Sequence, residues 1–253
     1  DQNLNGLLKE LSEDPDFDFY CLLDSIENVL QIKEAARKEK LNRPIQVLVE
    51  MGFEGGRTGC RSEKDAINLS QAVANNFPWV CLRGIEGYEA LLKTKPNPES
   101  KMKEFLNVIN NLAQICVKQG LFAEGPVIIS AGGSDYFDLV LKELNNSGEG
   151  REFIRVVRSG CYLTHDSLNY HESFKSLCKR SPEANIDQPG LLPAIKVWGV
   201  VQSLPESGLA IVNVGKRDVS YDAKLPIPEL LYSPNIGLIP KKLTDHCIVR
   251  DLN

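Results

Sequence analysis

Four glycine-containing segments each come directly after an apolar stretch that has the composition of a β-strand. They are GGRTG (55–59), GIEGY (84–88), SAGGS (130–134) and SGCY (159–162). Amphipathic stretches typical of helices separate them, so that strands expected near residues 17, 44, 79, 126 and 152 alternate with helices. This alternation predicts a parallel sheet with right-handed crossovers, in which ligands bind at the carboxyl ends of the strands.

Local signals place several of the helices. Ser25 and Ser62 stand where a helix N-cap is expected, and Asp65 follows Ser62 at the spacing of an acidic capping box. The sequence PNPES (96–100) precedes a long amphipathic helix that Gly120 is expected to close. A further helix is expected over residues 135–146.

The pattern changes after about residue 190. Strand-like runs follow one another without a helix between them, and PESG (205–208) is a plausible hairpin turn. We therefore expect two domains, a cofactor-binding β/α portion over residues 1–190 and an all-β domain over 191–253.

Composition excludes several classes of partner. The 253 residues carry a net charge of -5 and no dense basic patch, which argues against nucleic acid as a partner. No apolar run approaches the roughly 20 residues of a membrane span. Seven cysteines without a CxxC spacing indicate reduced thiols and a cytoplasmic protein.

Five predicted strands are compatible with two architectures. An open, doubly wound sheet can use five strands, whereas a closed parallel barrel needs eight. In the second case the chain would hold only part of the barrel.

Five ordered blocks carry a family resemblance, which covers roughly residues 16–250. They are VLVEMGFEGGRTGC, LRGIEGYEALL, VIISAGGSDYFD, VRSGCYLTHD and VNVGKRDVSYDAKLP. The chain resembles the D-serine dehydratase and D-threonine aldolase family of fold-type III pyridoxal-phosphate enzymes, and the last two blocks resemble bacterial D-serine deaminase-like members. The resemblance implies an alanine-racemase-like fold, a (β/α)8 barrel followed by an all-β domain.

The resemblance also implies that parts of the family's machinery lie outside this sequence. The Schiff-base lysine is expected on the first barrel strand, upstream of residue 1, so no catalytic residue is assigned. The ligands of a divalent metal, zinc or manganese, are expected beyond residue 253, and the adjacent His246 and Cys247 are not taken as ligands. The chain is accordingly expected to begin at about the fourth barrel strand.

Six residues are candidates for binding pyridoxal 5'-phosphate. By resemblance Arg57 would hydrogen-bond the pyridine nitrogen, although a surface arginine in a glycine-rich turn is the alternative. Backbone N–H groups of Gly132, Gly133 and Ser134, at the start of a helix, suit a phosphate, unless the segment is a simple capped turn. Tyr88 and Tyr162 could contact the phosphate, the ring or the substrate, or pack at the barrel rim.

Other polar residues are weaker candidates for a functional role. Glu86 could orient a tyrosine or an arginine, or lie in solvent. His165 and Asp166 are not expected to act as a pair, because neighbours on an extended chain point in opposite directions. Lys216 is in the wrong domain for a Schiff-base lysine.

The favoured function is that of a pyridoxal-phosphate-dependent lyase on D-amino acids with a β-hydroxyl, above all D-serine dehydration to pyruvate and ammonia. The alternatives are a D-threonine aldolase, a racemase and a non-enzymatic cofactor-binding protein. A racemase would need a tyrosine from the β domain, for which Tyr221 and Tyr232 are no clear candidates. The expected partners are a small D-amino acid and a second copy of the chain in a homodimer.

Overall fold

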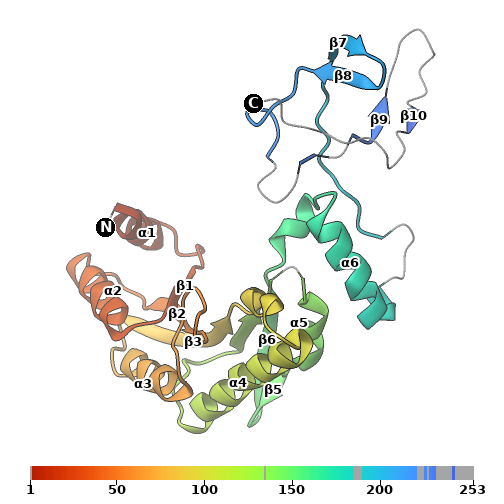
Figure 1. The fold of residues 1–253 in the computed structure, drawn as a ribbon. Helices are drawn as coiled ribbons and strands as arrows, with labels where there is room; N and C mark the ends of the chain where they lie inside the picture. Colours follow the sequence, from red (N-terminus) through yellow and green to blue (C-terminus); the bar gives the residue numbers. More distant parts are fainter. Residues whose placement is uncertain are drawn as a thin grey trace. The chain divides into compact units, whose positions relative to one another are not determined.

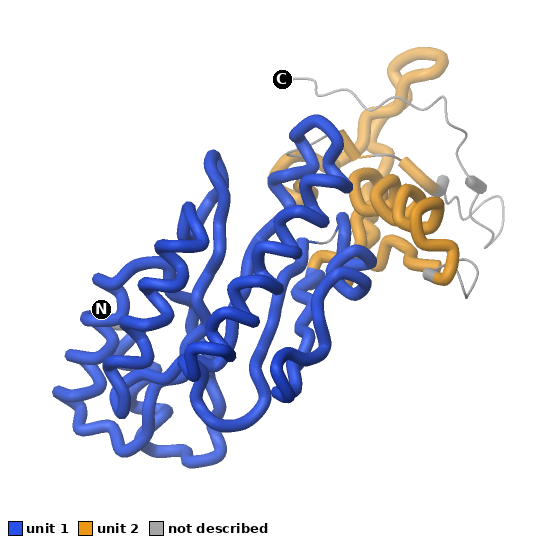
Figure 2. The backbone as a smooth tube through the Cα atoms, turned by 90° about the horizontal axis from the view of Figure 1, so that it is seen from below, with its two compact units in different colours: residues 1–160 blue, residues 161–253 orange. Residues whose placement is uncertain are grey.

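A computed structural model describes residues 2–133, 135–184, 190–220, 225–226, 228–231 and 241–242. The chain forms two compact units, residues 1–160 and 161–253 (Figure 2). The predicted domain boundary at residue 190 stays a prediction.

A parallel sheet organises the first unit. Its strands are β1 (Tyr20–Leu23), β2 (Ile45–Met51), β3 (Val80–Gly87), β4 (Val127–Ala131) and β6 (Arg151–Val157), all parallel and adjacent in chain order. A short β5 (Ser147–Gly148) pairs antiparallel with β6. The five predicted parallel strands are thus confirmed. Their sequential order is that of a β/α barrel and not of a doubly wound sheet, although the described strands do not close into a barrel.

Helices connect the strands as predicted. They are α2 (Ile26–Lys38), α3 (Glu63–Ala74), α4 (Pro98–Lys118) and α5 (Phe137–Glu143), with the 3-10 helix η1 (Ala90–Thr94) after β3 (Figure 1). Both predicted caps form, since Ser25 Oγ accepts the N–H of Asn28 at 3.3 Å and Ser62 Oγ that of Asp65 at 3.1 Å.

Two helices differ from the prediction. The chain begins with α1 (Gln2–Glu13), whose apolar positions include the buried Leu8 and Leu11. Helix α5 spans seven residues and not the twelve expected. Asn110 of α4 explains its end, because its side chain donates to the carbonyl of Glu143 at 2.7 Å and accepts the N–H of Asn145 at 2.9 Å.

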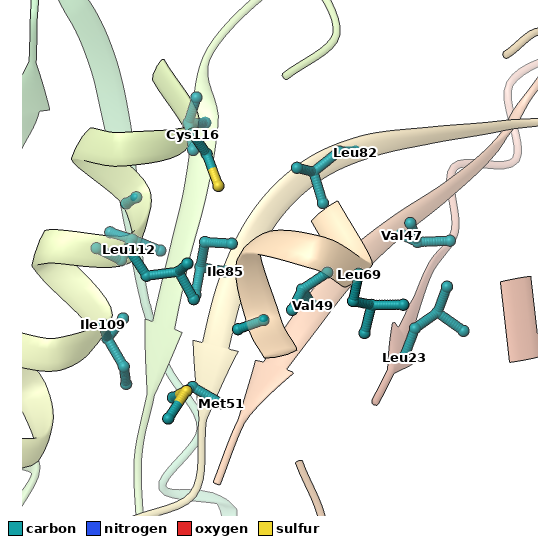
Figure 3. Close-up of a cluster of buried hydrophobic side chains, with 14 of the residues drawn as sticks. Leu23, Val47, Val49, Met51, Leu69, Leu82, Ile85, Ile109, Leu112 and Cys116 are labelled. Carbon is teal, nitrogen blue, oxygen red and sulfur yellow. The ribbon is translucent and has the colours of Figure 1, made fainter. Parts of the chain in front are cut away.

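The core lies between one face of the sheet and the helices α3 and α4. Alternate strand residues point into it, because successive side chains of a strand leave on opposite faces. The strands contribute Val47, Val49, Met51, Leu82 and Ile85, and the helices contribute Leu69, Ile109, Leu112 and Cys116 (Figure 3).

The opposite face of the sheet is called the inner face here. One row of register partners, one residue from each strand, crosses this face and consists of Leu22, Leu48, Gly84, Ile128 and Ile154. The two outer members of the row, Leu22 and Ile154, are 46% and 45% exposed. A second row, nearer the carboxyl ends, pairs Glu50, Glu86, Ser130 and Val156. The inner face thus changes from apolar to polar toward the end where ligands are expected.

The second unit follows with helices and then strands. The 3-10 helix η2 (Gly160–Leu163) spans the unit boundary, and α6 (Asn169–Arg180) and η3 (Pro182–Ala184) come after it. Strands β7 (Val201–Glu206) and β8 (Leu209–Val212) form the hairpin predicted at PESG, and β9 (Leu230–Leu231) pairs antiparallel with β10 (Lys241–Lys242). Within the described ranges, no helix combines the length and apolar character needed to cross a membrane.

Candidate functional site

The end of β3 is the centre of the candidate site. Residues 86–89 there contact segments that follow three other strands. Tyr88 meets the loop after β2, Glu89 meets the turn after β4, and Glu86 meets the residue after β6. One tetrapeptide therefore links four strand ends.

Arg57 and Tyr88, both predicted to bind the cofactor, lie together. The guanidinium carbon of Arg57 is 4.6 Å from the centre of the Tyr88 ring, a cation–π contact. Arg57 is exposed, and within the described part of the chain it has no hydrogen bond or ion pair. Its donors are therefore available to a ligand.

A compact loop presents Arg57. The guanidinium of Arg61 donates to the carbonyls of Thr58 at 2.8 Å and Gly56 at 3.0 Å. A Cβ atom at Gly52 would lie 2.2 Å from the Thr58 carbonyl oxygen, so the close return of the loop requires glycine at that position. The loop thus holds Arg57 at the end of β2.

The predicted phosphate donors Gly132 and Gly133 are engaged within the protein. The N–H of Gly132 donates to Glu89 Oε2 at 3.0 Å, and the N–H of Gly133 donates to Glu89 Oε1 at 2.6 Å. Glu89 is fully buried, and this burial raises the pKa of its carboxyl against the opposing effect of backbone hydrogen bonds, which include those from Gly132 and Gly133. Phosphate binding here stays a prediction, and it would require the Glu89 carboxylate to leave the two amides. Ser134 lies outside the described residues.

Close packing explains the glycines of this turn. Gly132 has a φ of +144°, and a Cβ atom on it would lie 2.7 Å from the backbone nitrogen of Arg158. A Cβ atom at Gly133 would lie 2.4 Å from the Cβ of Ala90. Both positions therefore need glycine for the fold itself, whether or not a ligand binds.

The buried Glu86 forms an ion pair with the partly exposed Arg158. Its Oε2 accepts from Arg158 Nη2, and the same nitrogen donates to the Gly87 carbonyl at 2.8 Å. Glu86 therefore orients an arginine, one of the roles predicted for it, and does not lie in solvent. Burial raises the pKa of Glu86 to about 7, against the lowering effect of Arg158.

Glu50 adds a third carboxyl group. It is the β2 neighbour of Glu86 in the sheet register, and it accepts a hydrogen bond from the Thr58 hydroxyl. No group of His, Cys, Asp and Glu side chains in the described ranges could hold a metal ion. The divalent metal stays a prediction, and His246 and Cys247 lie outside the described residues.

Tyr162 belongs to an aromatic cluster of the second unit. Its ring stacks on His165 at 5.3 Å between centroids and packs edge-on against Tyr170 and Phe174. A ligand contact by Tyr162 stays a prediction. Tyr162 belongs to the second unit, whereas Arg57, Tyr88 and the glycine turn belong to the first.

His165 and Asp166 form no hydrogen bond with each other, but the backbone at His165 is left-handed, with a φ of +48°, and not extended as expected. Asp166 Oδ1 accepts the N–H groups of Leu168 at 2.8 Å and Tyr170 at 3.3 Å, at the start of α6. His165 is 1% exposed, and burial, followed by the nearby His171, lowers its pKa. Its environment is therefore that of a packed core histidine.

The sequence reasoning did not single out Glu89, Arg158 or Arg61. Glu89 and Arg158 adjoin the quoted segments GIEGY and SGCY, and each is a charged residue within two positions of the end of a strand. That placement is the signal by which they could have been found.

Comparison with known proteins supports the fold. The sequence model of the alanine racemase N-terminal domain family matches residues 4–165. The crystal structure of D-threonine aldolase from Filomicrobium marinum is similar, with a TM-score of 0.63, 22% sequence identity, and coverage of 92% of this chain and 57% of that chain. The present chain therefore spans a little over half of the aldolase, and at this identity the likeness establishes the fold alone.

Alanine racemase from Bacillus anthracis is a more distant match, with a TM-score of 0.44, 14% identity, and coverage of 69% of this chain and 38% of that chain. This likeness is too weak to support a structural conclusion. No curated protein matches the sequence. Because the family model covers more than half of the residues, the chain belongs to the alanine racemase N-terminal domain family, with the alanine-racemase-like fold of the fold-type III pyridoxal-phosphate proteins.

Proposed function

We propose that this chain is the cofactor-binding part of a pyridoxal-phosphate-dependent lyase that acts on D-amino acids with a β-hydroxyl. D-serine, converted to pyruvate and ammonia, is the favoured substrate. Membership of the family supports pyridoxal phosphate as the cofactor. The observation that carries the proposal is the pairing of Arg57 with Tyr88 at the strand ends, beside the buried Glu86.

The residues around Arg57 fit the ring of pyridoxal phosphate. Arg57 has donors that no described residue uses, and Glu86 Oε1 is a buried oxygen without a hydrogen-bond partner in the described part of the chain. A guanidinium stays protonated, so a pyridine nitrogen that faces Arg57 would stay unprotonated. Arg57 would therefore orient the ring without adding a positive charge to it.

The residues predicted to bind the phosphate group fit it less directly than the residues around Arg57 fit the ring. Two of the three predicted donors, Gly132 and Gly133, already hold the Glu89 carboxylate. A phosphate would bind there in exchange for that carboxylate, or at other donors of the same strand ends.

Bound pyridoxal phosphate supplies an electron sink for negative charge at the α-carbon of an amino acid. This chain would contribute the groups that orient the ring, above all Arg57 and Tyr88. A divalent zinc or manganese ion, whose ligands would lie outside the described residues, would help the β-hydroxyl to leave. We also propose a homodimer in the cytoplasm, with a D-amino acid as its small-molecule partner and neither nucleic acid nor a membrane as a partner.

A D-threonine aldolase is the second candidate, favoured by the fold shared with the Filomicrobium marinum enzyme. The sequence blocks GCYLTHD and GKRDVSYD favour the dehydratase over the aldolase, because they resemble D-serine deaminase-like members. The residues around Arg57 serve either reaction.

The test begins with the visible spectrum of the natively expressed protein, before and after borohydride. A reducible chromophore, followed by release of pyruvate and ammonia from D-serine, supports the proposal. Cleavage of D-threonine without deamination of D-serine identifies an aldolase, and inversion of alanine identifies a racemase. A protein that binds no pyridoxal phosphate contradicts the proposal.

Arg57 is tested by substitution. Arg57→Ala should weaken the binding of pyridoxal phosphate, because it removes the donors that face the ring. Arg37→Ala, which removes an exposed arginine of α2, is the matched control and should bind as the wild type does. Equal affinities for the two variants would rule out this role for Arg57.

A further inference from the structure

The side chain of Glu86 lies on the inner face of the sheet. Its neighbour Gly87 faces α4, since a Cβ atom there would lie 2.7 Å from both Ile109 Cδ1 and Phe105 Cζ. Successive residues of a strand alternate between faces, so Glu86 points to the opposite side, the inner face. Tyr88, which Arg57 contacts, lies two residues further along the chain, so Glu86 adjoins the candidate ligand site.

The two oxygens of Glu86 differ in their surroundings. Oε2 accepts from Arg158 Nη2, whereas Oε1 is buried and has no hydrogen-bond partner among the described residues. The residue is 1% exposed. A buried carboxylate oxygen without a partner is costly, and a proton or a ligand atom would satisfy it.

Burial favours a proton on Glu86, and the charged groups near it act in both directions. Glu50 is its neighbour on β2, Glu89 follows it on the chain, and Arg158 reaches it from the end of β6. Glu86 thus has two carboxyl groups and one guanidinium as charged neighbours. Burial, helped by the like charges of Glu50 and Glu89 and opposed by Arg158, raises the pKa of Glu86 to about 7.

We propose that Glu86 is a proton-exchanging residue of the site on the inner face, where Oε1 transfers one proton to or from a basic nitrogen or oxygen of the bound ligand. On donation the O–H bond breaks, its electron pair stays on the carboxylate, and Arg158 stabilises that charge through Oε2. The reverse step restores the acid. The ligand's identity as pyridoxal phosphate or its amino-acid substrate rests on the proposed function, whereas the proton on Glu86 does not.

The proton is tested first, on the purified chain without added ligand. Infrared difference spectra recorded across a pH series report the protonated carboxyl group. The wild type should lose a buried-carboxyl band with a midpoint near pH 7. Glu86→Gln should remove that titration, while Glu54→Gln, which changes an exposed carboxylate of the Arg57 loop, should leave it in place.

A second variant tests the same proposal if Glu86→Gln folds poorly. Arg158→Gln removes the cation that lowers the pKa of Glu86, so the midpoint should rise by about 1 pH unit or more. A wild type without the band, a band that survives Glu86→Gln, or a midpoint unmoved by Arg158→Gln would overturn the proposal.

Exchange with the ligand is tested with pyridoxal 5'-phosphate as the probe. The pH dependence of its visible absorbance on the protein should shift by about 1 pH unit or more in Glu86→Gln relative to the wild type and Glu54→Gln. An unchanged midpoint refutes the exchange. A wild type that takes up no pyridoxal phosphate overturns the proposed function and the identity of the ligand, while the infrared titration still decides whether Glu86 holds the proton.

Discussion

The contact between Glu89 and the turn after β4 allows a quantitative prediction. Each oxygen of this buried carboxylate accepts one backbone N–H, from Gly132 and from Gly133. Glu89→Ala removes both acceptors and leaves two buried amides unsatisfied. Glu89→Gln keeps one carbonyl oxygen and turns an NH2 group toward the other amide, so it removes about half of the interaction.

The expected loss follows from the number of unsatisfied groups. An unsatisfied buried N–H costs about 1–3 kcal/mol, so Glu89→Ala should lower the free energy of unfolding by about 2–6 kcal/mol. Glu89→Gln should lower it by about 1–3 kcal/mol. The exposed control Glu54→Gln should stay within about 0.5 kcal/mol of the wild type.

Urea unfolding measures the three variants. With an m-value of about 2 kcal/mol/M, the loss in Glu89→Ala corresponds to a fall of about 1–3 M in the unfolding midpoint. In Glu89→Gln, the amides of Gly132 and Gly133 should exchange hydrogen faster than in the wild type, through local opening of the turn and without global unfolding. If Glu89→Ala shifts the midpoint no further than Glu54→Gln does, the two hydrogen bonds do not hold the turn and the reasoning fails.

Two further perturbations test the same region. Gly133→Ala should lower the free energy of unfolding, measured in urea, by about 1–3 kcal/mol, because the new Cβ would lie 2.4 Å from that of Ala90. Gly6→Ala on α1, where nothing lies within 4 Å of the new Cβ, should raise it by about 0.5–1 kcal/mol. Equal effects of the two substitutions would contradict the packing around Gly133. The pKa of Glu86 is about 7 in the folded state against an ordinary 4.5, so its contribution to stability is present below about pH 4.5 and is lost as the pH rises through 7. The wild type should therefore lose up to about 3 kcal/mol relative to Glu86→Gln between pH 4.5 and 8, and a difference that is constant over that range would refute the linkage.

Much of the fold followed from local patterns. The strands and the helix caps at Ser25 and Ser62 depend on residues a few positions apart, which a sequence displays directly. The missed helix α1 had the same kind of signal in the spacing of Leu4, Leu7, Leu8 and Leu11. The early end of α5 had none, because it depends on Asn110 of another helix.

For the candidate site, too, some features follow from the sequence and others only from the tertiary structure. The sequence determined by itself the succession of strands and helices along the chain, the family and the glycine-rich segments, because each rests on contiguous residues, whereas the order of the strands in the sheet came from the structure. Only the tertiary structure decided that Arg57 lies over Tyr88, that the amides of Gly132 and Gly133 hold Glu89, and that one oxygen of Glu86 is buried without a partner. These contacts join residues up to 44 positions apart, and burial and neighbouring charges, which set the pKa of Glu86, exist only once the strands lie side by side.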